Sequence, residues 1–296
     1  MGDRIFVIFN YTFVIIATLI VLYPLIYIIS ASISDPAAVN AGEMWLLPKG
    51  FTLEGYQKIF NNQDIWMGYK NTIIYTLLSV AVNLIVTLPC AYALSRPELF
   101  GKNFFVKFIM ITMFVSGGMI PTYLLVKSLG MINTMWALII PSAASVYNIV
   151  VTRSFFQSNI PRELEEAAIV DGCNDFRIFF QIVLPLSAPI IAVMALFVGV
   201  ARWNGFYDAL IYLSDRSKYP LQMILRELLI LQDLSSNQAA SGEAQQSTLE
   251  ALYRKQQLVA IIKYGVMIVS TLPVIIVYPF LQRYFVKGVM VGSLKG

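Results

Sequence analysis

Six long apolar stretches separated by polar segments set the pattern of this chain of 296 residues. They cover approximately residues 5–31, 71–95, 103–127, 133–153, 186–212 and 258–285. Each is close to the ~20 residues that an α-helix needs to cross a bilayer, where the backbone must satisfy its own hydrogen bonds. The pattern therefore predicts an all-α integral membrane protein with six transmembrane helices. Little of the chain remains for a soluble domain, so we expect one domain over residues 1–296.

The first apolar stretch also has features of a secretory signal peptide. Arg4 precedes it, and it ends near the small residues Ser30, Ala31 and Ser32. The apolar region of a signal peptide, however, spans only ~7–15 residues. Because this stretch is roughly twice that length, we predict that it is retained as the first span.

The distribution of Lys and Arg predicts which side of the membrane each loop faces. An even number of spans places both termini on one side, and short loops rich in Lys and Arg stay in the cytoplasm. The basic residues on one side are Arg4, Arg96, Lys102, Lys107, Arg153, Arg162, Arg177, Arg283, Lys287 and Lys295. Those on the other side are Lys49, Lys58, Lys70, Lys127, Arg216, Lys218, Arg226, Arg254 and Lys255. The first set occupies shorter loops, so we expect cytoplasmic termini, a cytoplasmic loop at 154–185 and outer loops at 32–70 and 213–257.

Composition supports a membrane protein and argues against other classes. Apolar residues make up 58% of the chain and charged residues 13%, against ~45–50% and ~25% in soluble domains. The net charge of +4 comes from residues that flank apolar stretches, so it gives no indication of nucleic-acid binding. Histidine, the commonest general base and metal ligand, is absent, and we expect no catalytic or metal-binding residues. Cys90 and Cys173 are predicted to be free thiols.

The polar segment between the fourth and fifth stretches contains a short predicted helix with both ends marked. Pro161 suits its first position, and Gly172 suits a left-handed stop. The positive end of the helix dipole favours Glu163, Glu165 and Glu166. Ala167 and Ala168 would let another surface approach closely. These residues leave two interpretations open: a docking surface for a partner, or a loop that packs beneath the bundle with its acidic side chains in water.

A motif in this loop resembles the complete EAA motif of permease subunits from ATP-binding-cassette (ABC) importers. Its matching positions are Glu166, Ala167, Ala168, Gly172, Ile182, Leu184 and Pro185. The spacing is that of the family, and so is the place between spans four and five. Trp203 with Asn204, and residues 278–288, are similar to carbohydrate-uptake permeases of the maltose-transporter type. The tail at 286–296 resembles members that import oligosaccharides or polysaccharide fragments such as alginate- or pectin-derived chains.

The resemblance implies the transmembrane domain of a type I ABC importer in the bacterial cytoplasmic (inner) membrane. The residues that would couple to a cytoplasmic ATPase are Glu166, Ala167, Ala168, Asp171 and Gly172. The implied partners are a second permease in a heterodimer, two ATPases that bind ATP and Mg, and an extracytoplasmic solute-binding protein. ATPase closure would switch the cavity between inward and outward access. The chain lacks a G-x-x-x-x-G-K-[ST] phosphate loop, so we expect it to bind no cofactor and to have no enzymatic activity.

Polar residues within the spans are candidates for a substrate path, because ionisable groups at membrane depth are costly. The candidates are Arg202, Trp203, Asn204, Tyr207 and Asp208 in the fifth stretch and Ser142, Ser145, Tyr147 and Asn148 in the fourth. Aromatic faces, amides and carboxylates suit a sugar site, yet the same residues fit interfacial anchors and interhelical hydrogen bonds. The residues interpreted as kinks or close crossings are Gly117, Gly118, Pro121, Pro141 and Pro273.

Alternatives remain at the level of cargo and of class. The importer could instead carry a small sugar, a polyol or glycerol phosphate. An ion-coupled secondary transporter would need internal carboxylates or broken repeats, and only Asp208 is a candidate. A membrane-embedded enzyme would need clustered reactive groups inside the spans. The polar outer segment 234–246 has no hydrophobic period, so we expect it to be an irregular linker or a contact with an external partner.

Overall fold

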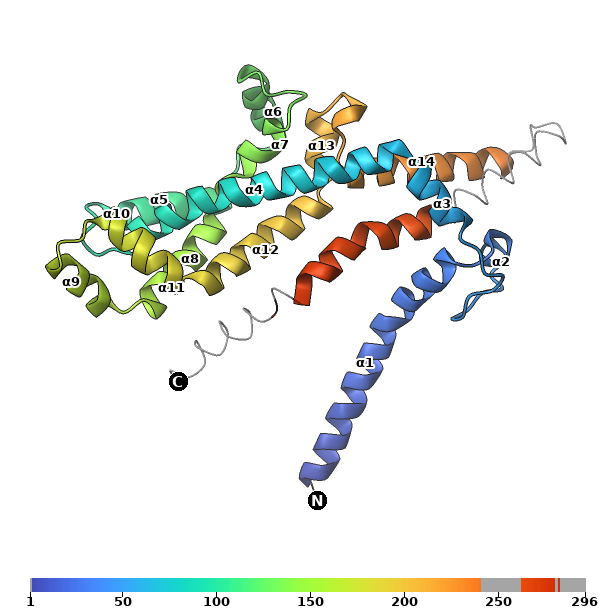
Figure 1. Cartoon of the computed structure of the whole chain (residues 1–296), viewed down its shortest axis with the longest axis horizontal. Coiled ribbons are helices and arrows are strands. Elements are labelled where there is room, and N and C mark those ends of the chain that lie inside the picture. Colours follow the sequence, from blue (N-terminus) through green and yellow to red (C-terminus); the bar gives the residue numbers. More distant parts are fainter. Residues whose placement is uncertain (1, 241–261, 280–281, 283–296) are drawn as a thin grey trace. The chain divides into compact units, whose positions relative to one another are not determined.

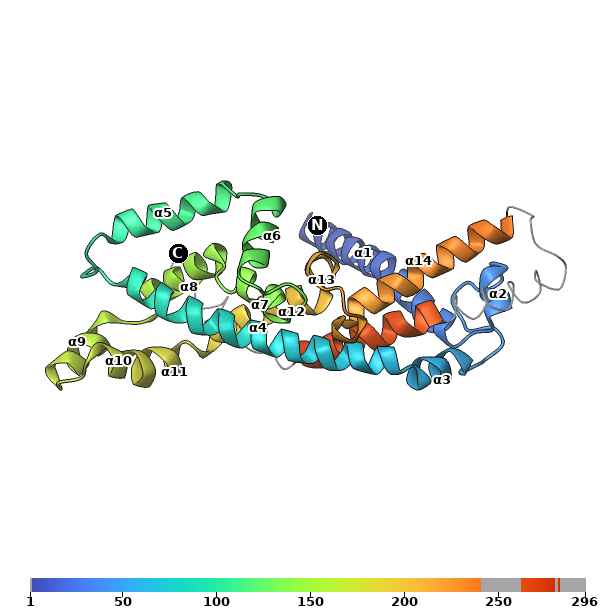
Figure 2. The same cartoon turned by 90° about the horizontal axis from the view of Figure 1, so that it is seen from above.

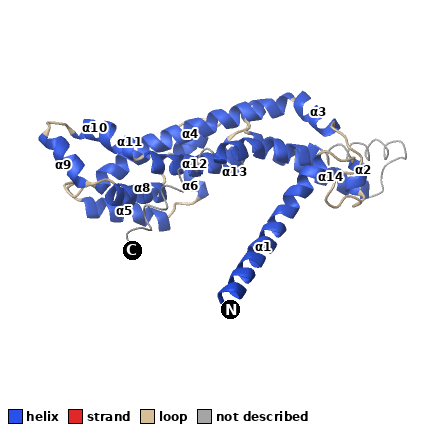
Figure 3. Cartoon of the chain, turned by 60° about the horizontal axis from the view of Figure 1, so that its bottom comes forward, coloured by secondary structure: helices blue, strands red, loops and turns tan. Residues whose placement is uncertain are grey.

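A computed structural model describes residues 2–240, 262–279 and 282. Every regular element within these residues is a helix, which confirms the predicted all-α class (Figures 1 and 3). The chain falls into two compact units, one of residues 1–66 and 223–273 and the other of residues 67–222 and 274–296. Each unit has its own cluster of buried apolar side chains.

The first unit begins with the most apolar helix of the chain. Its helices are α1 (Gly2–Ser32), α2 (Pro36–Asn40), α3 (Glu54–Asn61), the start of α4 (Gln63–Ser95), most of α14 (Leu221–Ala240) and part of the helix Ile262–Pro279. The apolar window of α1 has a mean hydropathy of 2.6, and none of it is buried. Exposure of so many apolar side chains fits a helix that lipid surrounds. Ala31, Val39 and Met44 form the small core at the end of this helix.

The second unit contains the predicted loop helix, which is α9 (Arg162–Val170), and most of α4. Its other helices are α5 (Lys102–Phe114), α6 (Met119–Ser128), α7 (Trp136–Ile139), η1 (Ile140–Ser142), α8 (Val146–Asn159), α10 (Asp175–Ile178), the π-helical η2 (Phe179–Val183), α11 (Leu184–Leu186), α12 (Ala188–Asn204), α13 (Tyr207–Tyr212) and η3 (Arg216–Lys218). Residues of α4, α8, α9, η2 and α12 share one buried core. In Figures 1 and 2, α9 and α10 lie at the end of this unit where α4 terminates.

Five of the six predicted spans have a counterpart among the described residues. Three helices are long and apolar enough to cross a bilayer by themselves: Arg4–Ser32, Gln63–Ser95 and Ile262–Pro279. Two bent pairs of helices are also long and apolar enough when each pair is taken together, with a bend of 49° before Val146 and one of 78° before Ala188, and each pair fits either a broken span or a re-entrant loop. The first break follows Pro141, as expected for a kink. The six-span count and the orientation of the termini stay predictions.

The third predicted span, 103–127, is divided in the structure. Its two parts, α5 and α6, are separated by residues 115–118. Gly118 has φ +84° and ψ 178°, a region of backbone space that is essentially open only to glycine. The expected irregularity at Gly117 and Gly118 is therefore a full break between two helices.

The helix of the second span is longer than its apolar stretch, and a further helix, α14, lies in the segment 213–257 that was predicted to be an outer loop. The helix of the second span begins at Gln63 instead of residue 71. The Asn62 side chain caps this start, because its oxygen accepts a hydrogen bond from the Asp64 amide at 2.9 Å. The expectation of an irregular segment at 234–246 is wrong for residues 234–240, which belong to α14. The sequence from 221 to 240 contains no Gly or Pro that would end the helix. The rest of this polar segment, residues 241–246, lies outside the described residues. So do most of the C-terminal residues that carry the family resemblance, at 280–281 and 283–296.

Candidate functional site

Both ends of α9 are set by local backbone geometry. Pro161 precedes the helix in an extended conformation, and two acidic residues occupy the first turn, where the helix dipole favours them. At the other end Gly172 has φ +76°. The amides of Gly172 and Cys173 donate to the carbonyls of Ile169 and Ala168, both at 2.9 Å, which is a Schellman stop. The predicted capped helix is confirmed, with Pro161 at the cap instead of the first turn.

The two faces of α9 have different surroundings. Glu165 and Ala168 are buried, and Ala168 belongs to the shared core of the second unit. Glu166 and Ala167, the first two residues of the motif, are exposed. Because consecutive helical residues point about 100° apart, neighbouring motif residues serve different sides. The small side chain of Ala168 permits a close approach between α9 and its own bundle.

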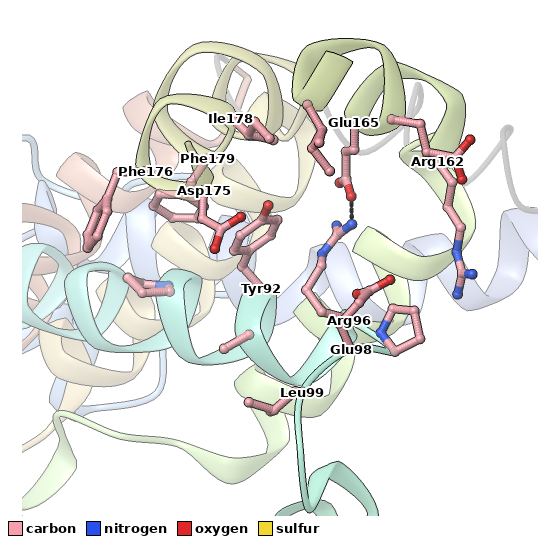
Figure 4. A pocket seen from close by; sticks show the side chains of 15 residues that line it. Tyr92, Arg96, Glu98, Leu99, Arg162, Glu165, Asp175, Phe176, Ile178 and Phe179 are labelled. Atoms are coloured by element: carbon pink, nitrogen blue, oxygen red, sulfur yellow. Dashed lines mark ion pairs between the residues drawn. The ribbon is translucent and has the colours of Figure 1, made fainter. Parts of the chain in front are cut away.

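Glu165 forms an ion pair with Arg96, the residue that follows α4 (Figure 4). The pair is largely shielded, with exposed side-chain fractions of 10% for Glu165 and 19% for Arg96. The Arg96 guanidinium also lies over the Tyr92 ring, 4.4 Å from its centroid. The Tyr92 ring lies 5.1 Å from that of Phe179 and 6.4 Å from that of Phe156. The pair thus joins α9 to α4 and, through Tyr92, to η2 and α8.

Burial leaves polar atoms of this pair without partners. Arg96 Nε and Glu165 Oε1 are buried and make no hydrogen bond. Removal of water lowers the pKa of the Arg96 guanidinium, and the positive charge of Arg162 lowers it further, whereas Glu98 and Asp175 act in the opposite direction. Desolvation of two charges offsets much of their attraction. The pair therefore fixes the direction of the contact between α9 and α4, and it does so at the cost of the hydration of both charges.

A cavity of about 550 Å³ opens beside the ion pair (Figure 4). It lies between the end of α4 with the loop that follows, α9, α10 and the start of η2. Its charged lining residues are Arg96, Glu98, Arg162, Glu165, Glu166 and Asp175. Four of these are acidic and two are basic, so the cavity carries more negative than positive charge. Across the described residues, no group of His, Cys, Asp and Glu side chains could hold a metal ion.

Polar side chains fix the last turn of α4, from which Arg96 extends. Arg153 Nε of α8 donates to the Leu94 carbonyl at 2.9 Å. Gln157 Nε2 and Lys102 Nζ both donate to the Ser95 carbonyl at 3.3 Å. Cationic donors suit the negative end of a helix dipole and satisfy carbonyls that have no partner within the helix. The backbone next to Arg96 is consequently well anchored.

A second cavity of about 350 Å³ lies within the predicted spans, and six of its ten lining residues are polar or charged. Its ion pair joins Arg202 Nη1 to Asp208 Oδ2 at 3.1 Å, and Arg202 Nη2 donates to Ser142 Oγ at 2.5 Å. Two amides also line it, and Asn148 Nδ2 donates to Asn83 Oδ1 at 3.4 Å. Such a lining offers donors and acceptors that fit the hydroxyl groups of a sugar.

The structure brings together only part of the predicted substrate path. The predicted residues that line the polar cavity are Ser142, Ser145, Asn148, Arg202 and Asp208. Trp203 is buried elsewhere, with its ring 6.2 Å from that of Tyr69. Asn204 is exposed at the end of α12, and the exposed Tyr207 donates its hydroxyl to Met119 Sδ at 3.2 Å.

Three residues that line these cavities were not predicted to be site residues: Arg96, Glu165 and Asn83. Arg96 was used only to predict topology, although a basic residue at the end of an apolar stretch also suits a helix C-terminus. Glu165 lies three residues before Ala168, and residues at that spacing share a helix face. Asn83 is an amide in the middle of an apolar stretch, which is itself a signal of an interhelical contact.

Comparison with known proteins gives three consistent matches. Residues 65–291 match the family described as "Binding-protein-dependent transport system inner membrane component". The chain is 41% identical over 295 residues to Protein LplC of Bacillus subtilis (strain 168), covering 100% of this chain and 96% of that protein. It is 39% identical over 301 residues to the polygalacturonan/rhamnogalacturonan transport system permease protein YtcP of the same strain, covering 100% of both.

A solved structure extends the similarity to three dimensions. It is the crystal structure of a bacterial ABC transporter involved in the import of the acidic polysaccharide alginate. One of its chains matches with a TM-score of 0.84 and 35% identity, covering 96% of this chain and 98% of that chain.

Proposed function

Because the chain belongs to the family of binding-protein-dependent transport system inner membrane components, we propose that it is the permease subunit of an ATP-driven importer of oligosaccharides or polysaccharide fragments. Its similarity to a pectin-fragment permease and to the alginate importer supports this cargo class. The whole chain then forms one transmembrane domain of six spans, with both termini and the loop 154–185 on the cytoplasmic side. The location is the bacterial cytoplasmic membrane.

The two-faced helix α9 is the observation that carries this proposal. Its inner face is fixed to the bundle, and its outer face presents Glu166 and Ala167 with the apolar Ile169 and Val170, which are 60% and 86% exposed. Exposed apolar side chains beside a carboxylate fit a protein interface. The coupling residues of this proposal are Glu166, Ala167, Ala168, Asp171 and Gly172. Within it, Ala168 acts from the inner face.

A permease that binds no ATP needs partner subunits. A second permease completes a heterodimeric pathway, and two ATPase subunits dock on the α9 helices and bind ATP and Mg. An extracytoplasmic solute-binding protein delivers the sugar. Closure of the ATPase pair brings the α9 helices together and switches the pathway from inward to outward access, a rigid-body change of packed elements.

The polar cavity of the second unit is the proposed substrate path. Asn148, Arg202 and Asp208 line it and would exchange hydrogen bonds with passing hydroxyl groups. Trp203, Asn204 and Tyr207 lie on the same two helices, α12 and α13, at positions outside the cavity. In this proposal they reach the sugar only when these helices move during the transport cycle.

Copurification combined with a substitution in α9 tests the proposed function. The chain, expressed with its neighbouring subunits and extracted in mild detergent, should retain an ATPase subunit. Glu166→Ala should abolish this association or reduce sugar uptake at least about fivefold, the low end of coupling between linked sites. The matched control is Glu54→Ala, which removes an exposed carboxylate from the first turn of α3. An ATPase that never copurifies, together with full uptake in Glu166→Ala, would rule out the importer assignment.

A further inference from the structure

We infer that Arg96 and Glu165 are positioning residues for energy coupling. Their ion pair holds α9 to the end of α4, so a displacement of α9 moves the membrane span with it. This role rests on the proposed function, in which α9 receives the movement of an ATPase subunit. In this role, Arg96 and Glu165 are the two residues of this chain that carry the movement into the bundle.

The ion pair is the main directional contact between α9 and the rest of the second unit. Of the nine residues of α9, only Glu165 and Ala168 are buried. Ala168 contributes one methyl group, whose contacts are weak and have no preferred direction. A charged hydrogen bond between a carboxylate and a planar guanidinium is stronger and fixes geometry. Glu165 and its partner therefore supply the directional part of the contact that places α9.

Arg96 is well placed to pass a displacement on. The carbonyls just before it are held by donors from Arg153, Gln157 and Lys102. Its guanidinium lies over Tyr92, one turn earlier in α4, and Tyr92 packs against Phe179 in η2. A force applied to Glu165 therefore acts on the anchored end of α4 and on the ring cluster behind it, instead of being absorbed by a flexible side chain.

Stability alone does not account for this pair. Both charges are largely shielded from water, and one nitrogen and one oxygen of the pair have no hydrogen-bond partner. Apolar residues in place of a buried ion pair often leave a protein as stable or make it more stable. A contact that costs solvation and fixes direction fits a role in transmission better than a role in holding the fold.

The neighbouring cavity makes the pair difficult to replace by other contacts. About 550 Å³ of open space borders the ion pair and, on α9, Arg162, Glu166 and Ile169. Without the ion pair, this space leaves α9 room to shift. An ATPase could then move α9 without moving α4, and ATP hydrolysis would no longer drive transport.

The test measures uptake and ATP hydrolysis together in proteoliposomes that contain the full complex and the binding protein. The transported probe is an oligogalacturonide, or an arabino-oligosaccharide if the wild-type complex does not take up the first. Glu165→Gln keeps the side-chain shape and removes the charge. We expect it to retain the ATPase subunit, while sugar transported per ATP falls at least about fivefold. Glu43→Gln, which breaks the exposed pair with Lys49, should leave that ratio unchanged.

Two double variants separate transmission from folding. Arg96→Gln/Glu165→Gln leaves no unpaired buried charge and should assemble with the ATPase yet remain uncoupled. Arg96→Glu/Glu165→Arg restores an ion pair and should recover sugar transported per ATP. Wild-type coupling in the double glutamine variant, or its failure to bind the ATPase, would overturn the role. Failure of the wild-type chain itself to bind an ATPase would instead defeat the proposed function.

Discussion

Glu165 and Glu166 show how neighbouring residues of identical type acquire different tasks. Glu166 is part of the motif, and its position on the exposed side of α9 agrees with what the resemblance implies. For Glu165 the sequence predicted only a favourable place at the positive end of the helix dipole, because its ion-pair partner, Arg96, is distant in sequence. Helical periodicity places Glu165 on the same face as Ala168. It does not reveal which side chain of another helix lies opposite, since that depends on tertiary packing.

Asp208 gives a prediction for the polar cavity. Asp208→Asn removes the charge that balances Arg202, whose side chain is only 11% exposed. Because Asp208 is half exposed, solvent screens part of the loss. We expect the sugar concentration for half-maximal stimulation of ATP hydrolysis to rise roughly tenfold, about 1.4 kcal/mol. The measurement is ATPase activity of the reconstituted complex against sugar and binding-protein concentration.

The matched control for this cavity is Asp215→Asn. Asp215 also forms an ion pair, with Lys218 at 3.5 Å, and has a similar exposed fraction of 43%, but it does not line the cavity. Its substitution should leave the sugar dependence unchanged. Equal behaviour of the two variants would assign Arg202 and Asp208 to an anchoring role at the membrane interface.

At the scale of elements, strong local signals predicted helix ends better than apolar periodicity did. Pro161 and Gly172 marked α9 to within a residue. Apolar stretches gave approximate spans, but not the break between α5 and α6 or the extension of α4 back to Gln63. A lipid-exposed stretch stays apolar whether its helix is continuous or broken. Its boundaries therefore depend on backbone conformation and capping, which hydropathy does not report.

The break between α5 and α6 provides an element-scale prediction. Gly118→Ala forces a side chain onto a backbone at φ +84°, which costs about 1–3 kcal/mol. The cost is backbone strain alone, because the added Cβ would meet nothing within 4 Å. We expect a lower midpoint of thermal unfolding for the detergent-solubilised complex.

Gly117→Ala is the control for that break. A Cβ at this position would make an ordinary contact of 3.8 Å with the Pro121 Cβ. Its unfolding midpoint should stay close to that of the wild type or rise slightly. A continuous α5–α6 helix would make the two substitutions equivalent, and equal midpoints would contradict the break.

At the scale of the whole molecule, composition and a single motif were sufficient to reach the family. The motif residues lie on a short helix at the surface, where sequence pattern and local structure correspond closely. The substrate path was predicted less completely. Arg202 and Asp208 meet in the cavity, whereas Trp203 next to them packs against Tyr69. The direction in which each side chain of a span points depends on breaks and bends that its apolar composition leaves open.

The predicted topology can be tested with two reporter cysteines in a chain whose Cys90 and Cys173 are replaced by Ala. Ser158→Cys lies in the loop 154–185, and Leu47→Cys lies at a residue that is 80% exposed in the loop 32–70. A membrane-impermeant maleimide should label Ser158→Cys only in inside-out vesicles and Leu47→Cys only in intact cells. Labelling of both from the same side would contradict the predicted topology.

The opposite exposure of adjacent residues on α9 also defines how this subunit can be engineered. Its inward residues, Glu165 and Ala168, are buried against its own bundle. In the proposed function, its outward residues contact the ATPase. Outward positions can be exchanged to accept the ATPase of another transporter, provided that the inward pair is kept in register. Insertion of one residue within α9 would rotate all later residues by about 100°. Chimeric importers should therefore be built by substitution on one face, never by a change of helix length.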